Sequence, residues 1–232
     1  MTISPRSIVS LLTGKFWAAS LDKMNDPFED RFKGSENRFL TDNCGVFCAS
    51  KFEEVEGNIL TNPLMWAHYT DNHTGIAIGL KTLSFAPNPS QIIYMSENEI
   101  ENQFKSLLDS HKINKDIAIT PLAEILFKYK PIYWKYENEY RQVHLRAANT
   151  YIDPNAEINE VVFGFRSKEE DELAVWSVLR NTIKYKKAIN RNGRIEIDDY
   201  IPPMELNVKK YLQLNLDMTG VTHDKISRIN SF

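Results

Sequence analysis

The chain has 232 residues, of which 42% are hydrophobic, and a net charge of −3 at pH 7; this suffices for one core and predicts a single domain over residues 1–232. The slightly acidic balance excludes a globally basic nucleic-acid footprint. No apolar run approaches the roughly 20 residues of a membrane span, and residues 1–5 lack a signal-peptide pattern, so we expect a cytoplasmic protein without a membrane partner.

Capping residues and apolar spacing predict the elements of the first half of the chain. Ser4 and Pro5 begin a helix that Gly14 ends. Further along we expect a polar loop over residues 21–31, a short helix over residues 63–69, and strands at 16–19, 45–50 and 75–80, the last one buried. Cys44 and Cys48 would lie roughly 13 Å apart on a strand, too far for a disulfide, which predicts two buried free thiols.

The second half alternates helical and strand patterns without regular βαβ order. Helices are predicted at 98–110, 121–129 and 169–179, and strands at 92–94, 140–145 and 160–165. Asn190–Gly193 is typical of a hairpin turn between strands at 185–189 and 194–197. These elements predict an α+β fold, with a mixed or antiparallel sheet core and flanking helices.

The stretch from Leu64 to Ile76 is the densest in hydrogen-bonding rings. It contains Trp66, His68, Tyr69 and His73. The two histidines are five residues apart and no further ligand lies near them, so no metal site is expected. If the helix ends near Tyr69, the following loop could bring His73 toward the Tyr69 ring, where such rings could stack on nicotinamide or adenine. The alternative is that the aromatics anchor the core and the histidines are hydrogen-bonded there.

A second motif runs from Tyr133 to Arg141 and includes Glu137 and Glu139. On a strand, residues two apart share one face at roughly 7 Å. Two carboxylates there repel each other unless a cation lies between them. That cation could be a ligand with developing positive charge, or an arginine such as Arg141 or Arg146.

Two polar segments have weaker patterns. Asn25–Glu29 predicts a defined turn, from which Asp26 or Glu29 could reach into a site; an Asx-capped corner is the alternative. The basic residues of the predicted hairpin favour a solvated face with weak nucleic-acid potential; they are Lys184, Lys186, Lys187, Arg191 and Arg194.

Three motifs, in this order, resemble a prokaryotic family known as the domain of unknown function 2971 (DUF2971). They are the Asn-Asp-Pro-Phe-Glu loop at Asn25–Glu29, the Met-Trp-Ala-His-Tyr segment at Met65–Tyr69 with His73-Thr74-Gly75, and Trp-x-Tyr-Glu-x-Glu-Tyr-Arg at Trp134–Arg141. The resemblance extends from about residue 8 to about residue 190 and leaves residues 191–232 as a C-terminal extension. It implies a bacterial protein but no activity.

The order of a ring-rich segment followed by Glu-x-Glu also looks like mono-ADP-ribosyltransferases. This resemblance implies an ADP-ribosyltransferase-like fold and an NAD-consuming enzyme, acting as a toxin or phage-defence effector on a protein or nucleic-acid acceptor. Glu139 would be the catalytic carboxylate, Glu137 would orient the acceptor, and His68 would stack on or hydrogen-bond NAD. The other implied NAD contacts are Asn25, Asp26, Trp66, Tyr69, His73 and Arg141.

Two other function classes stay open at this point. A metal-dependent nuclease or phosphodiesterase would use carboxylates as Mg²⁺ ligands, namely Asp26, Glu29, Glu137 and Glu139. A non-enzymatic ligand-binding or sensor module would use the aromatic stretches to line a binding surface. Phosphate-loop, dinucleotide-fold, zinc-protease and hydrolase motifs do not occur in the sequence, and the sequence does not indicate an oligomeric state.

Overall fold

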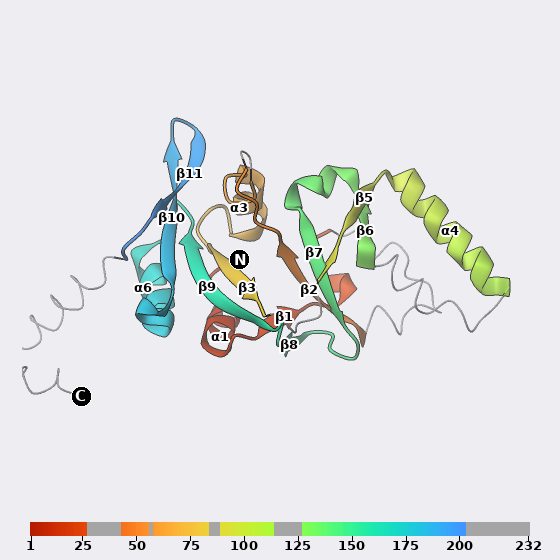
Figure 1. Ribbon diagram of the computed structural model, residues 1–232, viewed down its shortest axis with the longest axis horizontal. Helices are drawn as coiled ribbons and strands as arrows, with labels where there is room; N and C mark the ends of the chain where they lie inside the picture. The colour runs from red at the N-terminus through yellow and green to blue at the C-terminus, as the bar shows by residue number, and fades with distance from the viewer. Residues whose placement is uncertain (27–42, 56–57, 84–88, 114–126, 203–232) are drawn as a thin grey trace, which may run out of the picture.

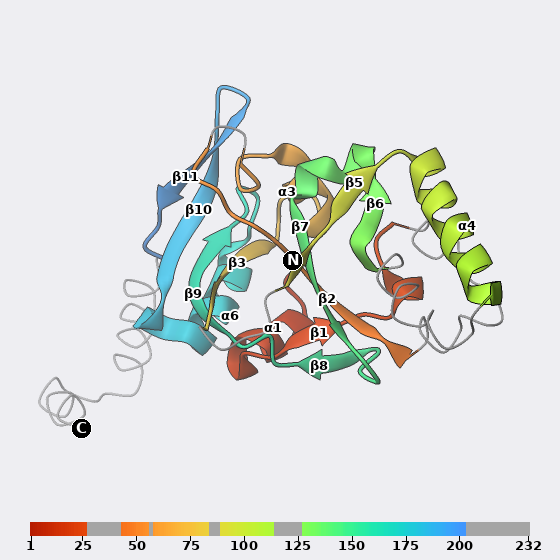
Figure 2. The same ribbon diagram turned by 45° about the vertical axis from the view of Figure 1, so that its right-hand side comes forward.

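The computed structural model describes residues 1–26, 43–55, 58–83, 89–113 and 127–202 (Figure 1). The described part is α+β, with mixed and antiparallel sheets and flanking helices, as the sequence predicts. Two groups of strands lie on either side of helix α3 (Pro63–Tyr69), which both ribbon views place between them (Figures 1 and 2).

A four-stranded sheet, in the order β11-β10-β9-β3, forms the first group. Strand β9 (Ala156–Phe163) is antiparallel to β3 (Ile76–Thr82) and parallel to β10 (Lys184–Arg191), which forms the predicted hairpin with β11 (Arg194–Asp199). Strand β11 lies within the predicted C-terminal extension, so the beginning of that extension completes this sheet.

Alternation along β9 determines which helix covers which face of this sheet. Val161 and Phe163 pack with Leu11 of α1 (Pro5–Thr13) and Val175 of α6 (Glu169–Leu179). Val162, between them, points to the opposite face and packs against Trp66 of α3. Helix α3 is therefore fixed to the sheet through the Trp66 ring, which is 2% exposed.

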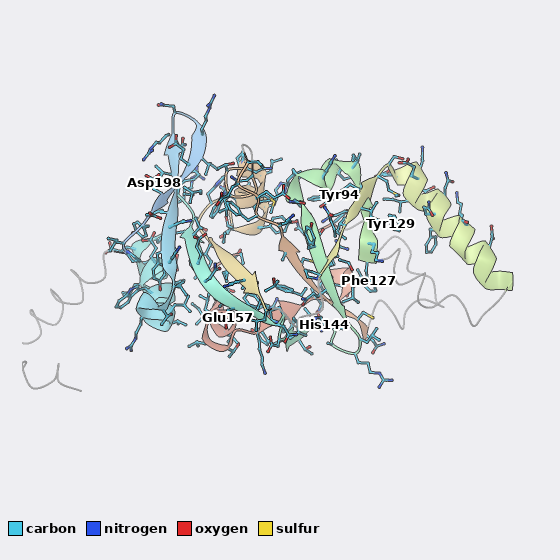
Figure 3. All side chains as sticks on the ribbon, in the orientation of Figure 1. Tyr94, Phe127, Tyr129, His144, Glu157 and Asp198 are labelled. Carbon is cyan, nitrogen blue, oxygen red and sulfur yellow. The ribbon has the colours of Figure 1, made fainter. Side chains whose placement is uncertain are left out.

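The second group is built around the antiparallel strands β2 (Gly45–Ser50) and β7 (Glu139–His144), with β4 (Ser90–Gln91) on the other side of β7. A bridge between Ala19 and Val46 connects β2 to the pair β1 (Phe16–Ala18) and β8 (Thr150–Ile152). The parallel pair β5 (Ile93–Met95) and β6 (Tyr129–Pro131) lies next to helix α4 (Glu97–Ile113). Figure 3 places the labelled Tyr94 and Tyr129 on this pair. The short 3-10 helices are η1 (Leu21–Lys23), η3 (Ile132–Glu137) and η4 (Arg180–Thr182).

Several local predictions are confirmed. Ser4 caps α1 through a reciprocal hydrogen-bonded box with Ser7, and Gly14 ends the helix with a φ of 68°. The strand at residues 45–50 and the helices at residues 63–69 and 169–179 have the predicted bounds. Cys44 and Cys48 form no disulfide.

Other local predictions are wrong. The strand predicted at residues 75–80 begins at Ile76 and is mostly half-buried, because β3 is an edge strand of its sheet. Of the helix predicted at residues 121–129, residues 127–128 are helical, but Tyr129 already begins β6, and residues 121–126 lie outside the described residues. Cys48 is exposed, whereas Cys44 is buried.

A left-handed turn after α3 fastens this helix to the end of β9. Asp71, Asn72 and His73 all have positive φ values, of 48°, 56° and 72°. The amide of Gly164 donates to the carbonyl of Gly75 at 2.8 Å, and that of Arg166 donates to the carbonyl of His73 at 3.1 Å.

In the part of the chain that the structure describes, no helix combines the length and the apolar character needed to cross a membrane.

The contact between the turn and Gly164 generates a stability prediction. A Cβ atom on Gly164 would overlap the carbonyl oxygen of His73, and neither backbone can move without breaking its hydrogen bonds. We expect Gly164→Ala to lower the free energy of unfolding by more than about 2 kcal/mol in urea titrations. Gly14→Ala is the control: it meets no atom within 4 Å and carries only the left-handed strain of its φ, about 1 kcal/mol. Equal losses for the two variants would contradict the packing argument.

Candidate functional site

The three sequence motifs meet at the side of α3 that faces η3. Tyr69, on α3, donates a hydrogen bond from its hydroxyl to Oε1 of Glu137, the last residue of η3. The same hydroxyl is hydrogen-bonded by the side chain of Asn25. Asn25, Tyr69 and Glu137 each come from a different motif, so residues more than forty positions apart in sequence form one hydrogen-bonded chain.

A lysine from outside the motifs lies between the two glutamates. Nζ of Lys130, on β6, is 2.6 Å from Oε2 of Glu137 and 3.0 Å from Oε2 of Glu139. The three side chains are only 3 to 6% exposed. Two buried carboxylates require a cation, and Lys130 supplies it.

Glu139 is held from several further directions. Nε of Arg141 is 2.7 Å from Oε1 of Glu139, and Nη2 is 3.1 Å from Oε2. The exposed thiol of Cys48 also hydrogen-bonds this carboxylate. The backbone amide of Glu139 donates to the hydroxyl of Tyr94 at 2.8 Å. Both carboxylate oxygens of Glu139 are therefore engaged, and Arg141, which was expected to contact NAD, is one of the groups that hold them.

The geometry expected for the two glutamates is wrong in one respect. Glu137 ends a 3-10 helix, and Glu139 begins β7, so they do not share a strand face. Between them Asn138 adopts a left-handed conformation with a φ of 43°. The side-chain amide of Asn138 donates to the backbone carbonyl of Lys51 at 3.1 Å. The backbone carbonyl of Asn138 accepts from the backbone amide of Lys51, also at 3.1 Å. This turn directs both carboxylates toward one ammonium group.

The two carboxyl groups differ in pKa. Burial opposes ionisation of Glu139, but the charge and hydrogen bonds of Arg141, together with Lys130, outweigh it and lower the pKa to about 2. For Glu137, burial is the larger effect and raises the pKa, against the pull of Lys130 and Tyr69. Burial also raises the pKa of the Tyr69 phenol, which stays protonated and able to donate.

Four aromatic side chains lie above this polar network, and we call them the ring cluster: His68, Tyr133, Trp134 and Tyr136. The ring centroids of His68, Trp134 and Tyr136 are 6.1 to 6.2 Å apart, and Tyr133 is 6.2 Å from Trp134. Nδ1 of His68 hydrogen-bonds the hydroxyl of Tyr136 at 2.9 Å. His68 is exposed, and Tyr133 is 53% exposed. Nζ of Lys130, which belongs to the polar network, lies over the Trp134 ring at 4.8 Å from its centroid.

Three residues expected at the site lie elsewhere or are buried. His73 does not turn back toward Tyr69; its ring packs against Phe165, 4.7 Å away, because the left-handed turn directs it toward the end of β9. Trp66 lies in the core and donates to the carbonyl of Leu60 at 2.6 Å, so it cannot stack on a ligand. Asp26 is 1% exposed, and Glu29 lies outside the described residues.

The metal-dependent alternative has little support from the described carboxylates. Glu137 and Glu139 are paired with Lys130, and within residues 1–26, 43–55, 58–83, 89–113 and 127–202 no group of three or more His, Cys, Asp or Glu side chains could hold a metal ion. Mg²⁺ sites are built from oxygen ligands that are free to coordinate.

The basic residues of the hairpin are largely neutralised. Lys186 pairs with Glu160 at 2.7 Å and Lys187 with Glu172 at 2.7 Å. Arg191 pairs with Glu196 at 2.7 Å and with Asp198 at 2.5 Å. These partners leave little net positive charge for a phosphate backbone.

Sequence reasoning missed Lys130, Tyr94 and the role of the ring cluster. Lys130 lies in an aromatic-rich stretch and carries no motif of its own, so the available signal was the requirement of Glu137 and Glu139 for a cation. Trp134 and Tyr136 lie in the Trp134–Arg141 motif just before the two glutamates, and this sequence position was the available signal for the ring cluster.

Comparison with family models finds that residues 65–142 match the family described as protein of unknown function (DUF2971). This segment contains two of the three motifs, Met65–Tyr69 and Trp134–Arg141, and confirms the family resemblance. Comparisons with curated proteins and with solved structures gave no significant match. The likeness to ADP-ribosyltransferases therefore stays a prediction.

The lowered pKa of Glu139 generates a prediction for stability against pH. A folded pKa of about 2 against a usual 4.5 means that Glu139 stabilises the fold at pH values above 4.5, by about 3 kcal/mol. This contribution is lost as the pH falls from 4.5 toward 2. In urea titrations, Glu139→Gln should therefore destabilise the protein most above pH 5 and progressively less at lower pH. The exposed Glu170→Gln is the control, and a pH-independent loss for Glu139→Gln would contradict the assignment.

Proposed function

We propose that the protein, whose residues 65–142 match the DUF2971 family model, binds a nucleotide whose base stacks on the ring cluster, with NAD as the first ligand to test. The observation that carries the proposal is the contact among His68, Trp134 and Tyr136 at a partly exposed position directly above a buried charged network. Exposed aromatic rings in such a position are typical of surfaces that stack planar bases.

The polar network supports this proposal because it immobilises the elements that carry the rings. The bond from Tyr69 to Glu137 joins α3 to η3, and Lys130 joins η3 to β6 and β7. The rings of α3 and η3 are thus held before a ligand arrives. A stacking surface that is already ordered loses less conformational entropy on binding.

Substitution of Trp134 tests the binding proposal. We expect Trp134→Leu to weaken NAD binding by about tenfold or more, because stacking of one base on an aromatic side chain contributes about 1–3 kcal/mol. Binding is measured by isothermal titration calorimetry, and the fold is checked by circular dichroism. Trp17→Leu is the matched control: Trp17 is also half-buried, but packs against Tyr151 on the β1-β8 pair. Equal binding by both variants would contradict a role for the ring cluster.

Consumption of NAD is a second candidate function, and the bond between Tyr69 and Glu137 favours it. Glu137 is the carboxylate next to the ring cluster, and its two oxygens are held by Tyr69 and Lys130, whereas Glu139 is held by the guanidinium of Arg141 in addition to Lys130. In such a reaction the bond between nicotinamide and ribose C1′ breaks and the electron pair leaves with nicotinamide. Glu137 would stabilise the positive charge on the ribose, and water or an acceptor hydroxyl would attack C1′ and lose a proton. Glu137 reaches the ribose only if Lys130 shifts toward Glu139.

Release of nicotinamide tests this second candidate. If the protein consumes NAD, Glu137→Gln should lower the rate of nicotinamide release, followed by chromatography, by about 100-fold or more, with NAD binding retained. The resemblance implies instead that Glu139 is catalytic, so Glu139→Gln is assayed at a pH and temperature where it remains folded. Depletion of NAD on expression in cells would support a toxin or defence role. Tight NAD binding without any nicotinamide release would exclude consumption and leave the binding proposal intact.

A further inference from the structure

We infer that the ring cluster selects a positively charged planar ring that carries a hydrogen-bond acceptor, and that Nε1 of Trp134 donates to this acceptor. The inference rests on the proposed nucleotide binding and narrows its ligand class. It is carried by two independent features, the charge around the rings and the hydrogen-bonding state of Trp134.

The surroundings of the rings favour a cation over a neutral ring. The hydroxyl of Tyr133 donates to Oε1 of Glu97, the first residue of α4, at 2.9 Å. A phenol that donates to a carboxylate has a more electron-rich ring, and the faces of aromatic rings attract cations. Glu137 directly follows Tyr136 in the chain, and its charge raises the pKa of that phenol after the larger effect of burial.

The buried cation of the site does not cancel this preference. Lys130 lies below Trp134, at 4.8 Å from its centroid, and is in contact with both Glu137 and Glu139. Its charge is therefore compensated on the buried side, away from a ligand that approaches the exposed Tyr133 and His68.

Trp134 supplies the second feature. Its indole nitrogen Nε1 is buried, and among the described residues it has no hydrogen-bond partner. Buried N–H donors in folded proteins nearly always have an acceptor. By contrast, Nε1 of Trp66 donates to the carbonyl of Leu60 at 2.6 Å. An acceptor supplied by the ligand would satisfy Trp134, and a ring carboxamide places such an oxygen beside a planar cation.

Ligands that differ only in the nicotinamide ring, a planar aromatic cation when oxidised and a neutral dihydropyridine when reduced, test the first feature. Oxidised and reduced NAD share the same adenosine and phosphates, but only the oxidised nicotinamide ring is positive. We expect oxidised NAD to bind about threefold to tenfold more tightly in calorimetric titrations, the range of a partly exposed cation–π contact. Glu97→Gln should reduce this preference, while Glu101→Gln, an exposed position on the same helix that pairs with Lys105, should preserve it.

Small ring compounds test the second feature. The cation 1-methylnicotinamide carries a carboxamide group on its ring, whereas 1-methylpyridinium has the same charge but no carboxamide group. Measured by NMR titration, the former should bind at least about threefold more tightly, and Trp134→Phe should abolish the difference, because phenylalanine keeps a ring but lacks the donor.

The outcomes separate this inference from the proposed function. Equal affinity for oxidised and reduced NAD, or an unchanged carboxamide preference in Trp134→Phe, would overturn the inference and leave nucleotide binding intact. Binding of adenosine nucleotides without nicotinamide at the same affinity as NAD would also overturn it. Failure of every nucleotide and ring compound to bind the folded protein would overturn the proposed function and the inference together.

Discussion

The ion pairs of Lys130 with Glu137 and Glu139 are the constraint on which the rest of the site depends. Either carboxylate alone, buried at 2 or 5% exposure, would be strongly unfavourable without a cation within hydrogen-bonding distance. Lys130 brings together the ends of β6, η3 and β7, which are adjacent in the chain but run in different directions. Asn138 is left-handed because this convergence requires a sharp change of direction between the two glutamates. The ion pairs of Lys130 therefore stabilise the left-handed backbone at Asn138, and this backbone conformation in turn positions Glu137 and Glu139.

Helix α3 connects this network to the four-stranded sheet. Although α3 has only seven residues, Trp66 packs on one side against Val162 and Ala188, while Tyr69 bonds to Glu137 on the other. The left-handed turn that follows is held by the amides of Gly164 and Arg166. A helix fixed on both sides cannot rotate without breaking one set of contacts. The ring of His68 is therefore presented toward Tyr136 by the packing of the whole domain, which no local propensity could achieve.

Local rules predicted much of the fold but only part of the site. Periodicity and capping rules could find the Ser4 cap of α1, its end at Gly14 and the bounds of residues 45–50, because these features depend on neighbouring residues. The requirement for a cation between Glu137 and Glu139 was also predictable from charge alone. The identity of this cation was not predictable. Lys130 reaches both glutamates because a 3-10 helix and a left-handed turn bring them to it, and the sequence pattern of a strand indicates neither. His73 was misplaced for the same reason, since three consecutive positive φ values are a tertiary effect.

The charge balance of the site argues that its rings, and not its carboxylates, meet a ligand first. Glu137 and Glu139 contribute two negative charges, which the positive charges of Lys130 and Arg141 offset at distances of 2.6 to 3.1 Å. A ligand charge that competes for these glutamates must displace a lysine or arginine that is itself buried, and this leaves an unpaired charge behind. The ring cluster requires no such exchange, because His68 and Tyr133 are already exposed. Any chemistry at Glu137 therefore depends on whether stacking on the rings offsets the cost of moving Lys130.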